Sequence, residues 1–230
     1  MAQKIINVEG IGEVLLIKNK ASRSIKISIT GDNVVRLSMP SWLPYQTGVK
    51  FVESRKDWVA EHRRPNRLYR DGDLFGKSHR LRIFTTSDES IKTRISQVEI
   101  KITIPADTTP ESSEVQSAIK RAALRAIKQE GEKLLPQRLA ELSQKHNFEY
   151  KSVDFKKMKA RWGSCTNQKD ITLNTFLMTL PWNLIDYVLI HELVHTKVLH
   201  HGVQFWEEFD RCLPNAKQYR KNLKVYSPHF

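Results

Sequence analysis

The sequence has few cysteines and no long apolar run. Only two cysteines, Cys165 and Cys212, occur in 230 residues, which is too few for a disulfide framework. No segment approaches the roughly 18 to 20 consecutive apolar residues of a membrane-spanning helix, and the first residues lack the apolar stretch of a signal peptide. We therefore expect a cytoplasmic protein with two buried thiols and no membrane partner.

Acidic residues are scarce relative to basic ones. Lys and Arg total 38 against 25 Asp and Glu, which gives a net charge of +13. A basic surface of this kind can contact nucleic acids or nucleotides. The chain lacks a glycine-rich phosphate loop and the aromatic-interleaved motif of a nucleic-acid module, so this contact is an alternative rather than the first expectation. Two of the basic clusters are formed by Arg63, Arg64, Arg67 and Arg70 and by Lys156, Lys157, Lys159 and Arg161.

Alternating runs rich in β-branched residues fill the first hundred positions. Residues 14–17, 24–29 and 34–39 have the period of two that is typical of antiparallel strands, and a helix is expected over 46–64. Residues 69–84 indicate a second hairpin and 98–104 a further strand. No internal repeat is evident. The pattern predicts a β-rich amino-terminal unit over residues 1–108.

A polar, proline-bearing stretch over 105–113 separates this unit from a more helical region. Residues 113–147 have the pattern of one long amphipathic helix, with a bend expected at Pro136. Strands are predicted over 153–161 and 170–174, and helices from Pro181 onward and over 204–211. Residues 109–230 are therefore expected to form a second domain.

An apolar helix near the carboxyl end carries the sequence His191-Glu192-Leu193-Val194-His195. Side chains four apart on a helix lie one above the other, so the two histidines can direct a nitrogen to one metal ion. The intervening Glu192 then lies beside that ion. This is the H-E-x-x-H arrangement of zinc hydrolases, in which the histidines hold Zn²⁺ and the glutamate takes a proton from the activated water.

A third ligand requires the helix to end. If the helix continued, His200 and His201 would point about 140° and about 120° away from the direction of His195, and neither could bind. Gly202, a residue type preferred just past helix termini, is expected to let the chain turn back. His201 then completes the spacing H-E-x-x-H-x5-H.

Two comparisons bear on this spacing. Astacin-type and matrix-protease zinc enzymes share it, but they have glycine where this chain has Val198, which argues against their clan. As in thermolysin-type sites, Glu207 or Glu208 on the next helix is a competing third ligand.

Several stretches together resemble one family. They are Arg161-Trp162-Gly163-Ser164-Cys165, residues 171–174, Pro181, residues 185–188 and residues 191–206. The combination resembles the YgjP-like metallopeptidases, whose zinc motif is similar to that of the WLM and SprT-like proteases. This family usually has asparagine before the third histidine and serine after it. His200 and Gly202 depart from that pattern, whereas His201 fits.

The resemblance is strong over about residues 113–225 and looser at Arg23-Ser24-Ile25-Lys26-Ile27 and Trp58-Val59. It implies an α+β, zincin-like metallopeptidase domain with the metal helix behind a small sheet. The strand that ends at Arg161, Trp162 and Gly163 is then expected along the substrate cleft, where an extended peptide could pair with its edge. A tight turn at these residues is the alternative interpretation.

We thus expect a zinc metallopeptidase that acts on protein or peptide substrates, with His191, His195 and His201 as ligands and Glu192 as general base. A metal-dependent nucleotide or phosphate hydrolase and a nucleic-acid-associated protease are the rival hypotheses. Several supporting roles stay open. The candidates are His200, Tyr219 and Tyr226 as oxyanion stabiliser, Asp210 as support for a ligand histidine, and Asn174 as an orienting residue.

Overall fold

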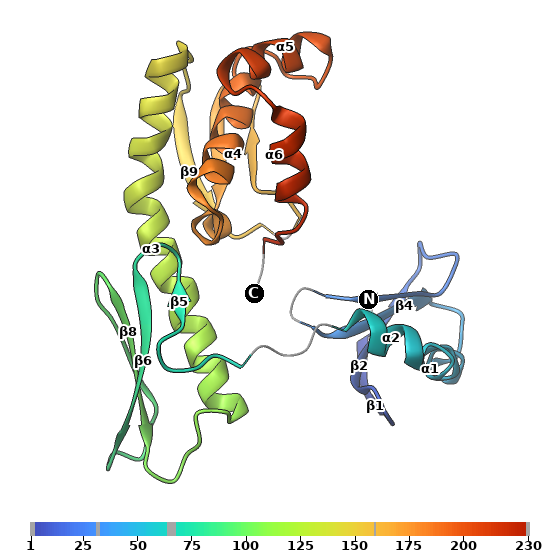
Figure 1. Ribbon diagram of the computed structural model, residues 1–230. Coiled ribbons are helices and arrows are strands. Elements are labelled where there is room, and N and C mark those ends of the chain that lie inside the picture. Colours follow the sequence, from blue (N-terminus) through green and yellow to red (C-terminus); the bar gives the residue numbers. More distant parts are fainter. Residues whose placement is uncertain (1–2, 31–32, 64–67, 159, 229–230) are drawn as a thin grey trace. The chain divides into compact units, whose positions relative to one another are not determined.

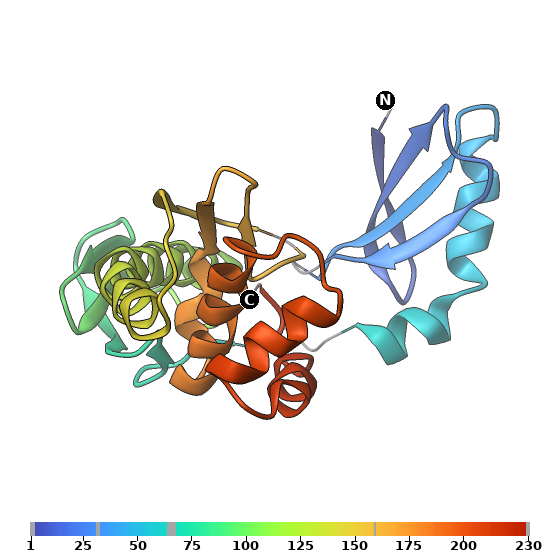
Figure 2. The same ribbon diagram turned by 90° about the horizontal axis from the view of Figure 1, so that it is seen from above.

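The computed structural model describes residues 3–30, 33–63, 68–158 and 160–228. The chain divides into two compact units, residues 1–67 and 68–229 (Figures 1 and 2). Three members of the basic clusters, Arg64, Arg67 and Lys159, lie outside the described residues. Within the described ranges, no helix combines the length and apolar character needed to cross a membrane.

The first unit is a four-stranded sheet with two short helices. Strand β1 (Gln3–Val8) pairs antiparallel with β2 (Gly12–Asn19), β2 pairs in parallel with β4 (Val35–Pro40), and β3 (Lys26–Ile29) pairs antiparallel with β4. Helices α1 (Tyr45–Glu53) and α2 (Lys56–His62) follow. Their inward side chains join alternate strand residues in one apolar core, which includes Val14, Leu16, Val35, Leu37, Met39, Val52 and Val59.

The second unit begins with another four-stranded sheet, which packs on a long helix. Its strands are β5 (Leu74–Phe75), β6 (His79–Thr86), β7 (Lys92–Ile95) and β8 (Glu99–Pro105), in the order β5-β6-β8-β7. Ile100, Ile102 and Ile104 alternate along β8 and are fully buried where the sheet packs on α3 (Ser113–His146). The Ser112 hydroxyl caps α3 by accepting a hydrogen bond from the Val115 amide.

These two sheets have the same strand plan. In each, a central parallel pair is flanked by two antiparallel edge strands. Their sequences correspond as well: residues 24–40 and 90–105 both begin with Ser-Ile-Lys, alternate through the strands and end with proline. An internal repeat is therefore present where the sequence interpretation expected none. The shared sequence signal is short, and the two segments differ in length by one residue, which obscures their correspondence.

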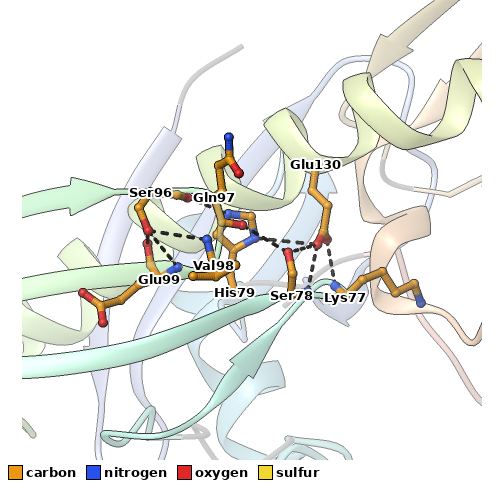
Figure 3. Close-up of polar contacts among 8 residues, drawn as sticks. All are labelled: Lys77, Ser78, His79, Ser96, Gln97, Val98, Glu99 and Glu130. Carbon is orange, nitrogen blue, oxygen red and sulfur yellow. Dashed lines mark hydrogen bonds and ion pairs between the residues drawn. The ribbon is translucent and has the colours of Figure 1, made fainter.

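Glu130 joins the second sheet to α3 through a buried network, drawn in Figure 3. Its carboxylate accepts hydrogen bonds from the backbone amides of Lys77 (2.7 Å) and Ser78 (2.8 Å) and from the Ser78 hydroxyl (2.6 Å). The His79 Nδ1 atom lies 3.7 Å from the same carboxylate. Lys77 also donates from Nζ to the carbonyl of Leu180. The network thus links the turn between β5 and β6, helix α3, and Leu180 just before helix α4 (Trp182–His195).

The rest of the second unit surrounds one apolar helix. A small sheet has the order β10-β11-β9, formed by β9 (Ser152–Lys156), β10 (Gly163–Cys165) and β11 (Asp170–Asn174). A 3-10 helix, η1 (Thr175–Thr179), leads to α4 (Trp182–His195), and α5 (Val203–Cys212) and α6 (Ala216–Leu223) complete the chain. Helix α4 contacts α3, β10, α5 and α6 (Figure 1). A two-pronged ion pair between Arg138 and Asp186 joins α3 to α4.

The α+β class predicted from the sequence is confirmed, but several expectations differ from the structure. The domain boundary expected between 108 and 109 does not match the division at 67/68, because β8 packs on α3 and the polar stretch between them is only a connecting turn. The helix expected over 46–64 is two helices, since Arg55 leaves the helical conformation between α1 and α2. The strands expected to be wholly antiparallel include the parallel pair of β2 and β4. The single long helix expected over 113–147 is confirmed as α3 (Ser113–His146), with Pro136 inside it.

Candidate metal centre

Helix α4 is apolar on nearly all sides, which places its histidines at the edge of the core. Nine of its fourteen residues are buried, Glu192 among them, whereas His191 and His195 are half-buried. The helix ends at His195, and the segment 196–202 leads into α5, which brings the exposed His201 back to the same point. The helix therefore ends where the sequence argument required.

The imidazoles of His191, His195 and His201 converge. His201 Nε2 lies 3.0 Å from His191 Nε2 and 3.2 Å from His195 Nε2. Nitrogens that share a tetrahedral zinc ion at about 2.0–2.1 Å are separated by about 3.3 Å, so this spacing fits one coordination sphere. Among the described residues, these three histidines are the only group of potential ligands gathered closely enough to hold a metal ion.

The protonation state of these histidines also favours the binding of a metal cation. Burial, assisted by the neighbouring His195, His201 and Arg220, lowers the pKa of His191 to about 3. Burial likewise lowers the pKa of His195. The ring of His195 can donate its Nδ1 proton to the carbonyl of Val198 at 3.1 Å, which leaves the Nε2 lone pair directed at the cluster. Neutral imidazoles of this tautomer are metal ligands.

Aromatic side chains from α5 form one wall of the cluster. The Phe205 ring, which is fully buried, lies 4.7–4.9 Å from the rings of all three histidines. Trp206 lies 6.1 Å from His201 and 6.5 Å from His191, measured between ring centroids. Sequence reasoning assigned no role to these residues.

Glu192 lies beneath β10. Its side chain packs against Gly163 so closely that a Cβ built at that glycine would lie 2.5 Å from Glu192 Oε1 and 2.7 Å from its Cγ. Only glycine leaves room for the carboxylate there. Burial raises the pKa of Glu192 to about 8, and the positive charge of Arg161 opposes that rise. Gly163 thus has a steric role beside the carboxylate that the sequence did not predict.

Asn174 holds the segment that leads into β10. Its side-chain amide donates to the carbonyls of Met158 and Arg161, both at 2.7 Å, and its backbone amide donates to the carbonyl of Trp162 at 2.9 Å. The residue is fully buried, so these bonds are protected from water. Asn174 therefore orients the Arg161-Trp162-Gly163 segment, which the sequence had left as one of its open roles.

Comparison with known proteins identifies the family. The YgjP-like metallopeptidase domain matches residues 23–226. The chain belongs to the YgjP-like metallopeptidase family. This YgjP-like chain therefore has a metallopeptidase domain, and the resemblance noted in the sequence is confirmed.

Two solved structures are similar to parts of this YgjP-like chain. The metallopeptidase zymogen of Pyrococcus abyssi abylysin shares 22% identity over 40% of this chain and 93% of its own, with a TM-score of 0.38. The zymogen of Methanocaldococcus jannaschii jannalysin shares 24% identity over 40% of this chain and 94% of its own, with a TM-score of 0.36. Comparison with curated proteins gives no match.

Other candidate residues of the YgjP-like domain fall outside the histidine cluster. Glu208 accepts hydrogen bonds from Lys197 at 3.2 Å and Arg211 at 2.6 Å, and Glu207 is exposed. Asp210 is exposed on α5, and His191 Nδ1 has no hydrogen-bond partner among the described residues. Asp210 therefore does not support that histidine.

The expected role of Gly202 is wrong. It does not end α4, whose last turn is followed by Thr196, but precedes α5 in an extended conformation. The three candidate oxyanion stabilisers also differ in setting. Tyr219 stacks on Tyr187 at 6.0 Å between ring centroids, whereas His200 and Tyr226 are exposed.

Proposed function

We propose that this chain is a zinc-dependent peptidase in which His191, His195 and His201 bind Zn²⁺ and Glu192 is the general base. The observation that carries the proposal is that His201 Nε2 lies 3.0 Å from His191 Nε2 and 3.2 Å from His195 Nε2. The buried Glu192 is on the helix that carries the first two histidines. Three histidines leave a fourth tetrahedral position for water or substrate, as in catalytic rather than structural zinc sites. A structural site would not need a carboxylate at position 192.

When bound, zinc supplies Lewis-acid chemistry, because it activates water and polarises a substrate carbonyl. The residues of the chain then handle the proton. Glu192 takes the proton of the attacking water and passes it to the leaving amine nitrogen. The Glu192 side chain packs directly against the backbone of Gly163 in β10. This contact limits movement of the carboxylate and supports a fixed geometry for the proton transfer.

We further propose that Arg161, Trp162 and Gly163 bind the peptide substrate. Strand β10 is at one edge of its sheet, since it pairs only with β11 among the described strands. An extended peptide can add to such an edge through backbone hydrogen bonds. The side chains of the preceding segment then lie along the bound peptide. The tight hold of Asn174 on that segment supports a preorganised edge.

The decisive experiment compares the native chain with Glu192→Gln, and uses the exposed Glu207→Gln as a matched control. Metal content is measured by mass spectrometry, and hydrolysis is followed on an unfolded protein. We expect all three proteins to retain zinc, and Glu192→Gln to lose at least about a thousandfold in kcat, because the proton acceptor is removed without a change of shape. Failure of the native chain to hold metal would sink the site.

The same panel tests the rival functions. Nucleoside triphosphates are included as substrates, and DNA binding is measured across a range of salt concentrations. Hydrolysis of nucleotides without cleavage of protein would replace the peptidase hypothesis with a phosphate hydrolase. Tight, salt-sensitive DNA binding would favour a nucleic-acid-associated protease that uses the basic surface. The cytoplasmic location stays a prediction, which cell fractionation can check.

A further inference from the structure

A cation without an acidic partner stands beside the histidine cluster. The guanidinium carbon of Arg220, on α6, lies 5.8 Å from the centre of the Trp206 ring, within the range of a cation–π contact. The Trp206 ring in turn lies 6.1 Å from the ring of His201 and 6.5 Å from that of His191.

Two cations of α5 and of the segment before it form ion pairs, whereas Arg220 on α6 does not within the described ranges. Lys197 and Arg211 both contact the carboxylate of Glu208, at 3.2 and 2.6 Å. In the described part of the chain, Arg220 makes no hydrogen bond or ion pair through its guanidinium, and its contact is the face of Trp206. Its donors are therefore available to a ligand.

The position of Arg220 is set by packing on the metal helix. The preceding residue, Tyr219, stacks on Tyr187 of α4 with ring centroids 6.0 Å apart and planes inclined by 21°. Tyr187 itself is 4% exposed and packs on Phe209 of α5. Tyr219 thereby fixes the backbone of α6 against α4 at the residue before Arg220.

We propose that Trp206 and Arg220 form a subsite for an acidic side chain of the peptide substrate, next to the bond that is cleaved. The inference rests on the proposed peptidase function and adds a substrate class to it. A guanidinium close to a metal centre experiences repulsion from a bound dication. An Asp or Glu carboxylate offsets that repulsion and accepts charge-assisted hydrogen bonds from the planar guanidinium. The indole ring of Trp206 offers the same guanidinium a cation–π contact at 5.8 Å.

A peptide anion fits the observations better than a phosphate. The subsite offers one unpaired guanidinium and an aromatic face, and the chain has no glycine-rich phosphate loop. One arginine neutralises the charge of one carboxylate, whereas a triphosphate carries several negative charges and would require several cationic donors. Stabilisation of the transition-state oxyanion is a different role for the same residue. The two roles separate in kinetics, because a specificity contact depends on the substrate side chain and an oxyanion contact does not.

The experiment begins with the sites that the zinc-loaded, full-length protein cleaves in an unfolded protein, mapped by mass spectrometry. The best-cleaved sequence is then synthesised with its acidic residue and with the matching amide. We expect cleavage to concentrate next to Asp or Glu, and native kcat/KM to be about ten- to hundredfold higher for the acidic peptide. Arg220→Gln should remove most of the difference in kcat/KM between the two peptides, because it should lower kcat/KM for the acidic peptide only. Arg220→Lys should retain part of that difference. Lys221→Gln, which removes the same charge one residue further along α6, should leave the ratio unchanged.

Each other outcome overturns the inference. No enrichment of acidic residues at the cleaved sites, or an unchanged ratio in Arg220→Gln, would show that the subsite does not read charge. An equal loss of kcat for both peptides would assign Arg220 to the oxyanion instead. Loss of nucleotide hydrolysis in Arg220→Gln, with no peptide preference in the native chain, would assign it to phosphate. The Glu192→Gln variant separates the peptidase proposal from the subsite inference. The peptidase proposal fails if that variant cleaves protein as the native chain does or if the native chain cleaves no protein, whatever Arg220→Gln shows.

Discussion

The two four-stranded sheets share one strand plan but differ in what covers them. The sheet of the first unit packs on α1, a helix of nine residues, and closes its own small core. The sheet of the second unit packs on α3, a helix of 34 residues that also contacts η1, β9 and α4. The same arrangement of strands is therefore a self-contained module in one unit and a part of the metallopeptidase core in the other.

Polar contacts reinforce this difference. The second sheet is joined to α3 by the buried Glu130 network (Figure 3). Lys77 of that network also donates to the carbonyl of Leu180, just before α4. The core of the first sheet is apolar, and α1 approaches the strands through Gly48, where a Cβ would lie 2.9 Å from the side chain of Leu37. The helix that covers a repeated sheet, rather than the sheet itself, decides whether the sheet supports the candidate metal centre.

Equivalent core truncations in the two sheets should have the largest effects. Leu37→Ala and Ile102→Ala each remove a fully buried side chain at the corresponding central strand, and each should cost about 2–5 kcal/mol in its own unit. Hydrogen exchange resolved by mass spectrometry can assign the loss to a unit. Ile102→Ala should also weaken metal retention on heating, whereas Leu37→Ala should not. Equal loss of metal in both variants would contradict the division of roles.

Removal of the Glu130 carboxylate should have the next largest effect. Glu130→Ala leaves two backbone amides and one hydroxyl without their acceptor, so we expect a loss of about 3 kcal/mol in urea-induced unfolding. Glu130→Gln retains one acceptor oxygen and should lose less. Faster amide exchange at Lys77 and Ser78, with no change over residues 14–40, would be the local signature. Unchanged exchange at these two amides would contradict the role given to the network.

Two matched glycine substitutions, one in each unit, should have the smallest effects on stability. They test whether each close contact serves catalysis or packing. Gly163→Ala introduces a methyl group against the Glu192 carboxylate, and Gly48→Ala introduces one against Leu37. Gly163→Ala should lower kcat by about a hundredfold with metal retained, because a shift of about 1 Å misplaces the proton acceptor. Gly48→Ala should instead cost about 1–3 kcal/mol of stability and leave peptide hydrolysis unchanged.

A double variant checks that the effect of Gly163→Ala acts through Glu192. In the Glu192→Asp background the shorter side chain leaves space for the added methyl group. The same glycine substitution should then cost much less than it does in the native chain. An equal loss of kcat in both backgrounds would show that Gly163 acts on the strand rather than on the carboxylate.

Local patterns predicted much of the fold. The alternation in β8, the long helix α3 with its Ser112 cap, and the start of α4 after Pro181 all follow from short-range periodicity and capping chemistry. The domain boundary, the parallel pairing of β2 with β4 and the split between α1 and α2 were not predicted. These features depend on which surfaces pack together, and strands of either direction have the same alternation.

The sequence by itself determined the spacing of His191, Glu192 and His195 on one helix, because the helical period places residues four apart on the same face. It also required α4 to end before His201. Only the tertiary structure decided that Gly163 contacts the Glu192 side chain and that Arg220 lies over Trp206. It also decided that Asn174 binds the carbonyls of the Arg161–Gly163 segment. These contacts join residues that are 12 to 29 positions apart in the chain. Such contacts arise from the packing of whole elements, on which periodicity within a single element carries no information.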